Sequence, residues 1–297
     1  MTITIAGGSG FLGRALITRW RNDGHLVRVL TRKPRPGEPD DVAWKPDGSV
    51  GPWSVAIDGA DAVVNLSGEG IADRRWNEQR KHDLHASRVL STRSLAAAIA
   101  TAARPPAVFV SGSAVGYYGA HGEEIVTEAT PPGQDFLATL CVDWEREAEQ
   151  ASAVTRVAMV RTGLVLDKRG GVLGQMLTPF RLGVGGPLGN GRQFMPWIHI
   201  ADWVGLLRWL IDNDGARGAF NGTAPTPVTN AEFSRALGKA LHRPALVPMP
   251  GFVLKVLVGE FADSVLTGQR AVPARAEEMG YNFSFRTLGP ALKDLLD

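Results

Sequence analysis

Hydrophobic and polar positions follow two different periods along the first two-thirds of the chain. Short apolar runs rich in β-branched residues predict strands at 3–6, 25–30, 62–66, 107–110 and 157–160. Longer stretches with helical spacing lie between them, at 11–21, 76–102 and 137–151. Because strands and helices alternate, we predict an α/β fold: a Rossmann-type, doubly wound parallel sheet with helices on both faces.

The spacing loosens past residue 161. Glycines cluster at 183–191, and the proline-containing segments 225–229 and 244–250 interrupt helical patterns at 201–212, 230–241 and 250–258. We therefore predict a dinucleotide-binding domain over 1–165, with 198–222 returning to its sheet. Residues 166–297 are expected to form most of a smaller, substrate-side C-terminal lobe.

Composition narrows the class of protein. The 297 residues include 32 basic and 30 acidic side chains, and this balance does not suggest a nucleic-acid partner. The single cysteine, Cys141, cannot form an intramolecular disulfide, and no cluster has the spacing of a metal site. The apolar run at 253–258 is short and contains Lys255, and the first residues do not resemble a signal peptide. We expect a cytoplasmic protein with no membrane partner.

A glycine-rich loop follows the first predicted strand at once and opens the first predicted helix. In that setting glycine permits a tight turn, a close approach of the backbone to a pyrophosphate, and close packing of helix on strand. The N-terminus of the helix offers free N–H groups to phosphates. The alternative is a turn that only packs. The candidate cofactor-binding residues are Gly7, Gly8, Ser9, Gly10, Phe11, Leu12 and Gly13.

The end of the second strand suggests which dinucleotide binds. NAD-preferring domains place an acidic residue there, about 20 residues on, to hold the ribose 2′-hydroxyl. This chain instead has Thr31, Arg32 and Lys33, a hydroxyl and two cations that suit a 2′-phosphate. A solvated basic turn is the alternative interpretation. We predict NADP(H) rather than NAD.

Further landmarks accompany these two motifs along the whole chain. The sequence resembles an extended short-chain dehydrogenase/reductase, the group that includes sugar-nucleotide epimerases. It is most similar to an atypical "epimerase family" subgroup, with a family-specific domain of unknown function in its last ~50 residues. The landmarks are residues 31–34, 64–69, 75–77, 111–113, 117–119, 143–145, 161–163, 196–200 and 268–270.

The resemblance implies further cofactor contacts. Residues Leu66, Ser67 and Gly68 would pass over the adenosine side, and Leu164 would offer its backbone to the nicotinamide amide. Periodicity alone would place Leu66 and Leu164 in the core. Arg88 stands where ordinary members carry asparagine, with Asp83 near enough on the same helix to orient it.

The catalytic pair of the family is missing. Members use a tyrosine as general acid/base, a lysine four residues later that lowers the tyrosine pKa, and a serine that polarises the substrate oxygen. Ser113 matches the serine, but Leu137 and Cys141 stand at the other two positions. None of the three tyrosines in the chain has lysine four residues later.

Other side chains could supply chemistry. Tyr117 or Tyr118 could act as an acid beside a cation, although pocket-wall residues are the more ordinary interpretation. His199 could face the substrate or donate to backbone, and Cys141 could be a reactive thiol or a small buried hydrophobe. Glu69, Gln269 and Arg270 could contact substrate; a capping role for Glu69 and a surface salt bridge for the other two are the alternatives.

Two interpretations from different classes remain. The first is an NADP(H)-dependent oxidoreductase or epimerase-like enzyme with an altered proton donor, in which the 183–187 loop helps close a pocket over an unknown small molecule. The second is a non-catalytic NADP(H)-binding sensor or scaffold. Either could be a monomer, or a homodimer paired through its two long helices.

Overall fold

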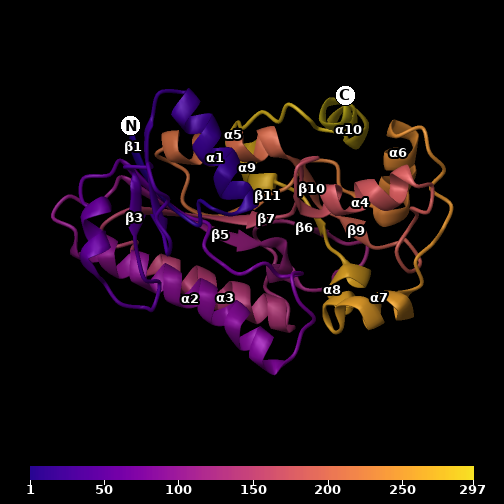
Figure 1. Ribbon diagram of the computed structural model, residues 1–297, viewed down its shortest axis with the longest axis horizontal. Coiled ribbons are helices and arrows are strands. Elements are labelled where there is room, and N and C mark those ends of the chain that lie inside the picture. The colour runs from indigo at the N-terminus through magenta and orange to yellow at the C-terminus, as the bar shows by residue number, and fades with distance from the viewer.

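A parallel sheet forms the centre of the computed structural model, which describes residues 1–297 (Figure 1). Its seven strands have the order β11-β7-β5-β4-β1-β2-β3, and all neighbours are parallel. The sequence prediction of a Rossmann-type α/β fold is therefore confirmed. The strands are β1 (Thr2–Ala6), β2 (Leu26–Thr31), β3 (Asp41–Ala43), β4 (Ala62–Asn65), β5 (Val108–Ala114), β7 (Arg156–Thr162) and β11 (Gly218–Gly222).

Helices cover both faces of the sheet, because successive strand residues point to opposite sides. Ile5 and Val64 pack with α1 (Phe11–Asn22) and α5 (Ile200–Asp212), whereas Ala6 and Val63 pack towards α2 (Glu78–Thr101) and α3 (Phe136–Glu149). Figure 1 shows the two helix pairs on opposite sides of the strands. The 3-10 helix η1 (Pro52–Ala56) closes the second face with Trp53.

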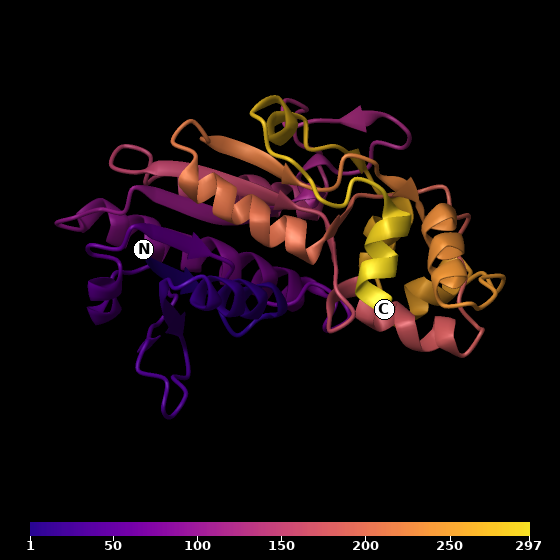
Figure 2. The ribbon, with the colours of Figure 1, turned by 90° about the horizontal axis from the view of Figure 1, so that it is seen from above.

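Most of the other elements gather at one end of the molecule (Figure 2). Small pairings hold them: β10 with β8, β12 with β9, and β13 with β6. Their hydrophobic side chains, such as Trp197 and Phe233, belong to the same cluster as Ile5, so one core continues from the sheet into this end. These elements are η2 (Val115–Tyr118), β6 (Ile125–Val126), β8 (Leu164–Leu166), α4 (Gly171–Arg181), β9 (Phe194–Met195), β10 (Trp197–His199), β12 (Val228–Thr229), α6 (Asn230–Ala240), α7 (Gly251–Val258), α8 (Phe261–Thr267), β13 (Arg270–Ala271), α9 (Ala274–Glu278) and α10 (Leu288–Leu296).

None of the helices combines the length and the apolar character needed to cross a bilayer.

Candidate cofactor and active site

The glycine loop joins β1 to α1 at the carboxyl end of the sheet. Gly7 has φ +83°, and a Cβ there would lie 2.5 Å from the carbonyl oxygen of Leu66. A Cβ on Gly13 would overlap the carbonyl oxygen of Gly7. These two glycines are therefore required by the loop itself, because any side chain would collide with backbone.

Gly10 differs from its neighbours. A Cβ at this position would meet only the carbonyl oxygen of Gly7, at 3.3 Å, and the residue is exposed. Gly10 is the N-cap of α1 but gives no side-chain cap, and the first turn contains no acidic residue. The first N–H groups of α1 therefore stay available, as a bound phosphate would require.

Two exposed cations follow β2. Neither Arg32 nor Lys33 forms an ion pair, whereas the nearby Arg35 is bound to both oxygens of Asp41 at 2.7 and 2.8 Å. The Thr31 hydroxyl accepts a hydrogen bond from the Lys33 backbone N–H at 3.3 Å. The end of β2 thus presents uncompensated positive charge and no carboxylate.

Residues 66–68 run beside this loop, after β4. The Leu66 carbonyl lies against Gly7, and the buried Ser67 hydroxyl has no hydrogen-bond partner in the protein. A buried hydroxyl without a partner is uncommon, because the loss of its water is not compensated. Together with the open approach at Gly10, this hydroxyl fits a site built for a polar ligand such as a dinucleotide.

Arg88 lies behind this segment on α2. Its guanidinium donates to the carbonyl oxygens of Leu84 and Glu69 at 3.0 and 2.9 Å, and it covers the ring of Trp144 at 5.3 Å. The expectation that Asp83 orients Arg88 is wrong. The carboxylate of Asp83 accepts from Gln79 at 2.8 Å instead. Asp83 and Arg88 are five residues apart on α2, and this spacing places their side chains on different faces of the helix.

The backbone N–H of Leu164 is already used within the protein. It donates to the carbonyl oxygen of Pro196 at 2.8 Å, as β8 pairs with β10. This N–H is therefore not free to donate to a nicotinamide amide.

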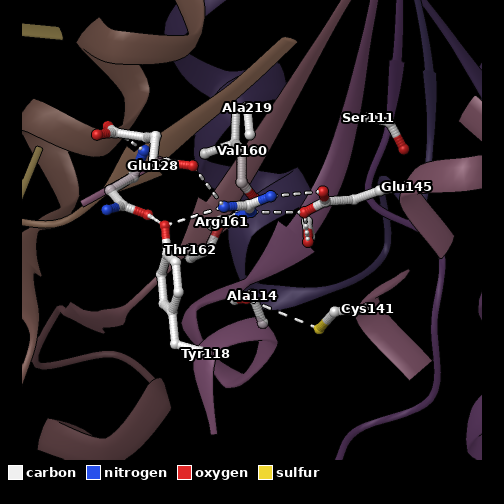
Figure 3. Close-up of polar contacts among 12 residues, drawn as sticks. Ser111, Ala114, Tyr118, Glu128, Cys141, Glu145, Val160, Arg161, Thr162 and Ala219 are labelled. Carbon is white, nitrogen blue, oxygen red and sulfur yellow. Dashed lines mark hydrogen bonds and ion pairs between the residues drawn. The ribbon is translucent and has the colours of Figure 1, made fainter. Parts of the chain in front are cut away.

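The two positions that the resemblance assigns to the tyrosine and lysine, Leu137 and Cys141, lie on α3. Leu137 packs against Gly116, directly before the tyrosines of η2. Cys141 is buried, and its Sγ lies 3.7 Å from the carbonyl oxygen of Ala114 (Figure 3). Burial, reinforced by the charge of Glu145, raises the pKa of the Cys141 thiol to about 12. Cys141 is thus a protonated packing residue, the second of the two interpretations offered for it.

Ser113 does not offer its hydroxyl to a substrate. It is buried and donates to Oε1 of Glu145 at 2.6 Å. Glu145 in turn binds Arg161 through two hydrogen bonds, at 2.8 and 2.9 Å (Figure 3). The expected role of Ser113 in polarising a substrate oxygen is not supported by this geometry.

The two tyrosines of η2 are held by the same arginine. Tyr118 is fully buried, accepts from Arg161 at 3.1 Å and donates to Asn221 at 2.7 Å, and burial raises its pKa to about 12. Tyr117 lies with its ring 3.4 Å from the Arg161 guanidinium carbon, and its hydroxyl has no partner in the protein. Of the two, only Tyr117 keeps a free phenol.

His199 is a structural residue of the C-terminal lobe. Its Nδ1 accepts the backbone N–H of Ala201 and caps α5, and its Nε2 lies 3.2 Å from the carboxylate of Asp294. The ring stacks on Phe285 at 3.9 Å and is buried. His199 does bond to backbone, but it accepts the N–H of Ala201 rather than donating as we expected.

Two of the remaining candidates, Glu69 and Arg270, have protein partners. Glu69 pairs with Arg80, and the guanidinium of Arg270 lies 5.0 Å from the ring of Phe194 on β9. Gln269 directly precedes Arg270 beside β13 and is half-buried. In the 183–187 loop, Gly186 packs against the backbone of Val247.

The buried arginine cluster was missed by the sequence analysis. We call it the Arg161 network: Ser113, Tyr118, Glu145, Arg161 and Asn221. It joins α3, β5, β7 and β11. The motifs that contain Glu145 and Arg161 were noticed, but nothing in the linear sequence pairs a helix carboxylate with an arginine on a later strand.

Comparison with known proteins gives two family matches. Residues 3–221 match the NAD dependent epimerase/dehydratase family, and residues 249–295 match a domain of unknown function, DUF1731.

Relatives cover the whole chain. The mouse "Epimerase family protein SDR39U1" is 41% identical over 300 residues, which is all of both proteins. A Mycobacterium tuberculosis epimerase family protein is 42% identical over 98% of this chain and 96% of its own length. The crystal structure of human SDR39U1 (isoform 2) with NADPH superposes with a TM-score of 0.92, at 39% identity over 99% of each chain.

Proposed function

The chain belongs to the NAD dependent epimerase/dehydratase family, and from this premise we propose that it binds NADPH across the carboxyl ends of β1, β2 and β4. The observation that carries the proposal is the end of β2, where Arg32 and Lys33 are exposed and form no ion pairs, and where no carboxylate stands at the position that holds a ribose 2′-hydroxyl. The NADPH in the human relative's crystal supports the same cofactor.

The residues of the chain divide the binding task. The free N–H groups of the first turn of α1 would hold the diphosphate, and the small Gly10 would let it approach. The guanidinium of Arg32 would bind the 2′-phosphate through two parallel hydrogen bonds. The unpartnered hydroxyl of Ser67 would gain a partner on the ligand. The cofactor would supply hydride, and the protein would supply its orientation.

We propose that any reaction here, oxidoreductase or epimerase-like, proceeds without the tyrosine–lysine pair. Leucine carries no exchangeable proton, and the protonated thiol of Cys141 supplies no positive field. The free phenol of Tyr117, stacked on Arg161, is the proton source that the geometry supports best. The buried hydroxyl of Tyr118 is already used on both sides.

A second candidate function is a non-catalytic NADPH-binding sensor or scaffold. It is favoured by a specific observation: Ser113 donates to Glu145 and His199 caps a helix, so neither of these two candidate substrate contacts is free.

Turnover assays on the NADPH-loaded protein distinguish the candidates. With carbonyl and quinone substrates, an enzyme that uses Tyr117 would lose turnover in Tyr117→Phe while keeping its affinity for NADPH. Turnover unchanged in that variant would contradict the role of Tyr117. No turnover by the unmodified protein, with tight NADPH binding, would favour the sensor.

A further inference from the structure

Charge is distributed very unevenly over the fold. Residues 168–201 and 233–259 contain eight lysines and arginines and no aspartate or glutamate. The rest of the chain therefore carries 24 basic and 30 acidic residues. The two segments contain α4, β9, β10, most of α6, α7 and the loops between them, which lie towards one end of the molecule (Figures 1 and 2). We call this part the basic end.

The cations of the basic end are mostly free. Six of the eight form no ion pair: Lys168, Arg181, Arg192, Arg235, Lys239 and Arg243. The acidic residues at its border are already engaged. Asp167 binds Arg169, Glu232 caps α6, Asp263 binds Lys255, and Glu260 binds Lys81. Six cations of the basic end are thus left without an ion-pair partner.

The same end exposes large apolar side chains. It holds eight of the fourteen in the molecule: Leu182, Val184, Leu246, Val247, Met249, Phe252, Val256 and Leu257. The most exposed are Leu246 at 81%, Leu182 at 72% and Phe252 at 71%.

Three of these side chains lie on α7, and the other five lie in the loops that follow α4 and α6. Gly186 lies against Val247, and the N–H of Gly189 donates to the carbonyl oxygen of Met249 at 2.9 Å. An exposed apolar group of this extent normally marks an interaction surface, because a soluble surface gains nothing from it.

We propose that the basic end docks on the surface of an anionic lipid bilayer. The exposed face of α7 would enter the headgroup boundary through Phe252, Val256 and Leu257, and the free cations would meet lipid phosphates. Charge complementarity favours a polyanion as the occupant, and the apolar side chains favour a bilayer over a nucleic acid. Our sequence expectation of no membrane partner rested on the lack of an apolar run long enough to span a bilayer, which does not bear on a surface that docks without crossing.

Sedimentation of the full chain with vesicles tests the proposal. We expect binding to phosphatidylcholine–phosphatidylglycerol vesicles at low salt, little binding to phosphatidylcholine alone, and release at about 0.5 M salt. The variant Arg181→Gln/Lys239→Gln should weaken binding on the order of fivefold per cation removed. The matched control, Lys45→Gln/Arg104→Gln, removes two exposed cations from outside the basic end and should bind normally.

The apolar half of the surface has its own variants. Leu246→Ser/Phe252→Ser should lose vesicle binding, whereas Val55→Ser, at an equally exposed position in η1, should not. Unchanged thermal unfolding would show that each variant is folded. The proposal is overturned if the chain ignores anionic vesicles, if it binds duplex DNA but not vesicles, or if the apolar variants change only self-association.

Discussion

At the scale of single residues, the glycines of the cofactor loop have different tasks. A Cβ on Gly7 or Gly13 would collide with backbone atoms, whereas a Cβ on Gly10 would meet only the carbonyl oxygen of Gly7, at 3.3 Å. We predict that Gly10→Val folds normally but loses NADPH binding, because its side chain would fill the place of the diphosphate.

Gly7→Ala is the matched contrast. It should lower the free energy of unfolding by more than about 1 kcal/mol, because its φ is +83° and the new Cβ would meet Leu66. Thermal unfolding and NADPH titration of both variants check this. Normal NADPH affinity in Gly10→Val would mean that the loop is not the binding site.

The cysteine allows a second test. Since burial raises the pKa of Cys141 to about 12, the thiol stays protonated at neutral pH. We expect negligible reaction with a thiol reagent until the protein is unfolded, and Cys141→Ser should bind NADPH with unchanged affinity. Rapid labelling of the native protein, or a large loss of affinity, would assign the thiol a part in the site.

The residues of the candidate site were predictable where they are local in sequence. The glycine loop and Arg32–Lys33 are contiguous motifs whose chemistry is readable from their order. The partners of Ser113 and His199 were not predictable, since they depend on how α3 sits on β7 and where α10 packs. Asp83 was misjudged for a local reason, its angle around the helix axis.

At the scale of elements, one buried ion pair fastens α3 to the sheet. Arg161 has only 5% of its side chain exposed, and Glu145 is its carboxylate partner. Glu145→Ala should lower the free energy of unfolding by about 3–5 kcal/mol, because it leaves the buried cation of Arg161 without a partner.

Glu147 gives the control on the same helix. Its partner Arg93 is 49% exposed, so Glu147→Ala should cost about 1 kcal/mol or less. Denaturant unfolding of both variants measures the difference, and equal losses would contradict the burial argument.

The cap of α5 should make stability depend on pH. Burial lowers the pKa of His199 below its usual 6.5, although Asp294 and Asp202 oppose the shift. Below pH 6.5, His199 is protonated in the unfolded chain but stays neutral in the folded chain. The free energy of unfolding therefore falls as the pH drops below 6.5.

His199→Asn keeps a capping side chain but does not titrate. Denaturant unfolding of both proteins between pH 7.5 and about 5 should show that the free energy of unfolding falls less in the variant than in the unmodified protein. The difference should not exceed about 1.4 kcal/mol per pH unit, the limit for one proton. Identical pH profiles would contradict the lowered pKa.

Two elements that the sequence failed to predict, β3 and α4, lack a readable hydrophobic pattern. The edge strand β3 is only three residues long and begins with an aspartate, so no apolar run marks it. Helix α4 begins at Gly171 and contains Pro179, which hide its helical period. The buried strands and amphipathic helices of the sheet were recovered because burial itself imposes their patterns.

At the scale of the whole molecule, the outer face of α2 and α3 bears on self-association. None of the exposed large hydrophobic residues lies on either helix, and polar side chains such as His82 and Arg146 are exposed there. Stable homodimer interfaces are more apolar than this. We predict a monomer of 31.8 kDa by light scattering. A dimer broken by charge reversal on α2 would contradict it.

The account depends most on the two cations that follow β2, Arg32 and Lys33, and a parallel titration with NADPH and NADH tests their role directly. We predict tighter binding of NADPH, and in Arg32→Ala a loss of about 10- to 100-fold for NADPH with little change for NADH. Arg35→Ala, whose guanidinium is already held by Asp41, should preserve the preference. Equal affinity for both cofactors, or equal losses in Arg32→Ala, would contradict the 2′-phosphate site, and no binding of either would contradict the proposed function.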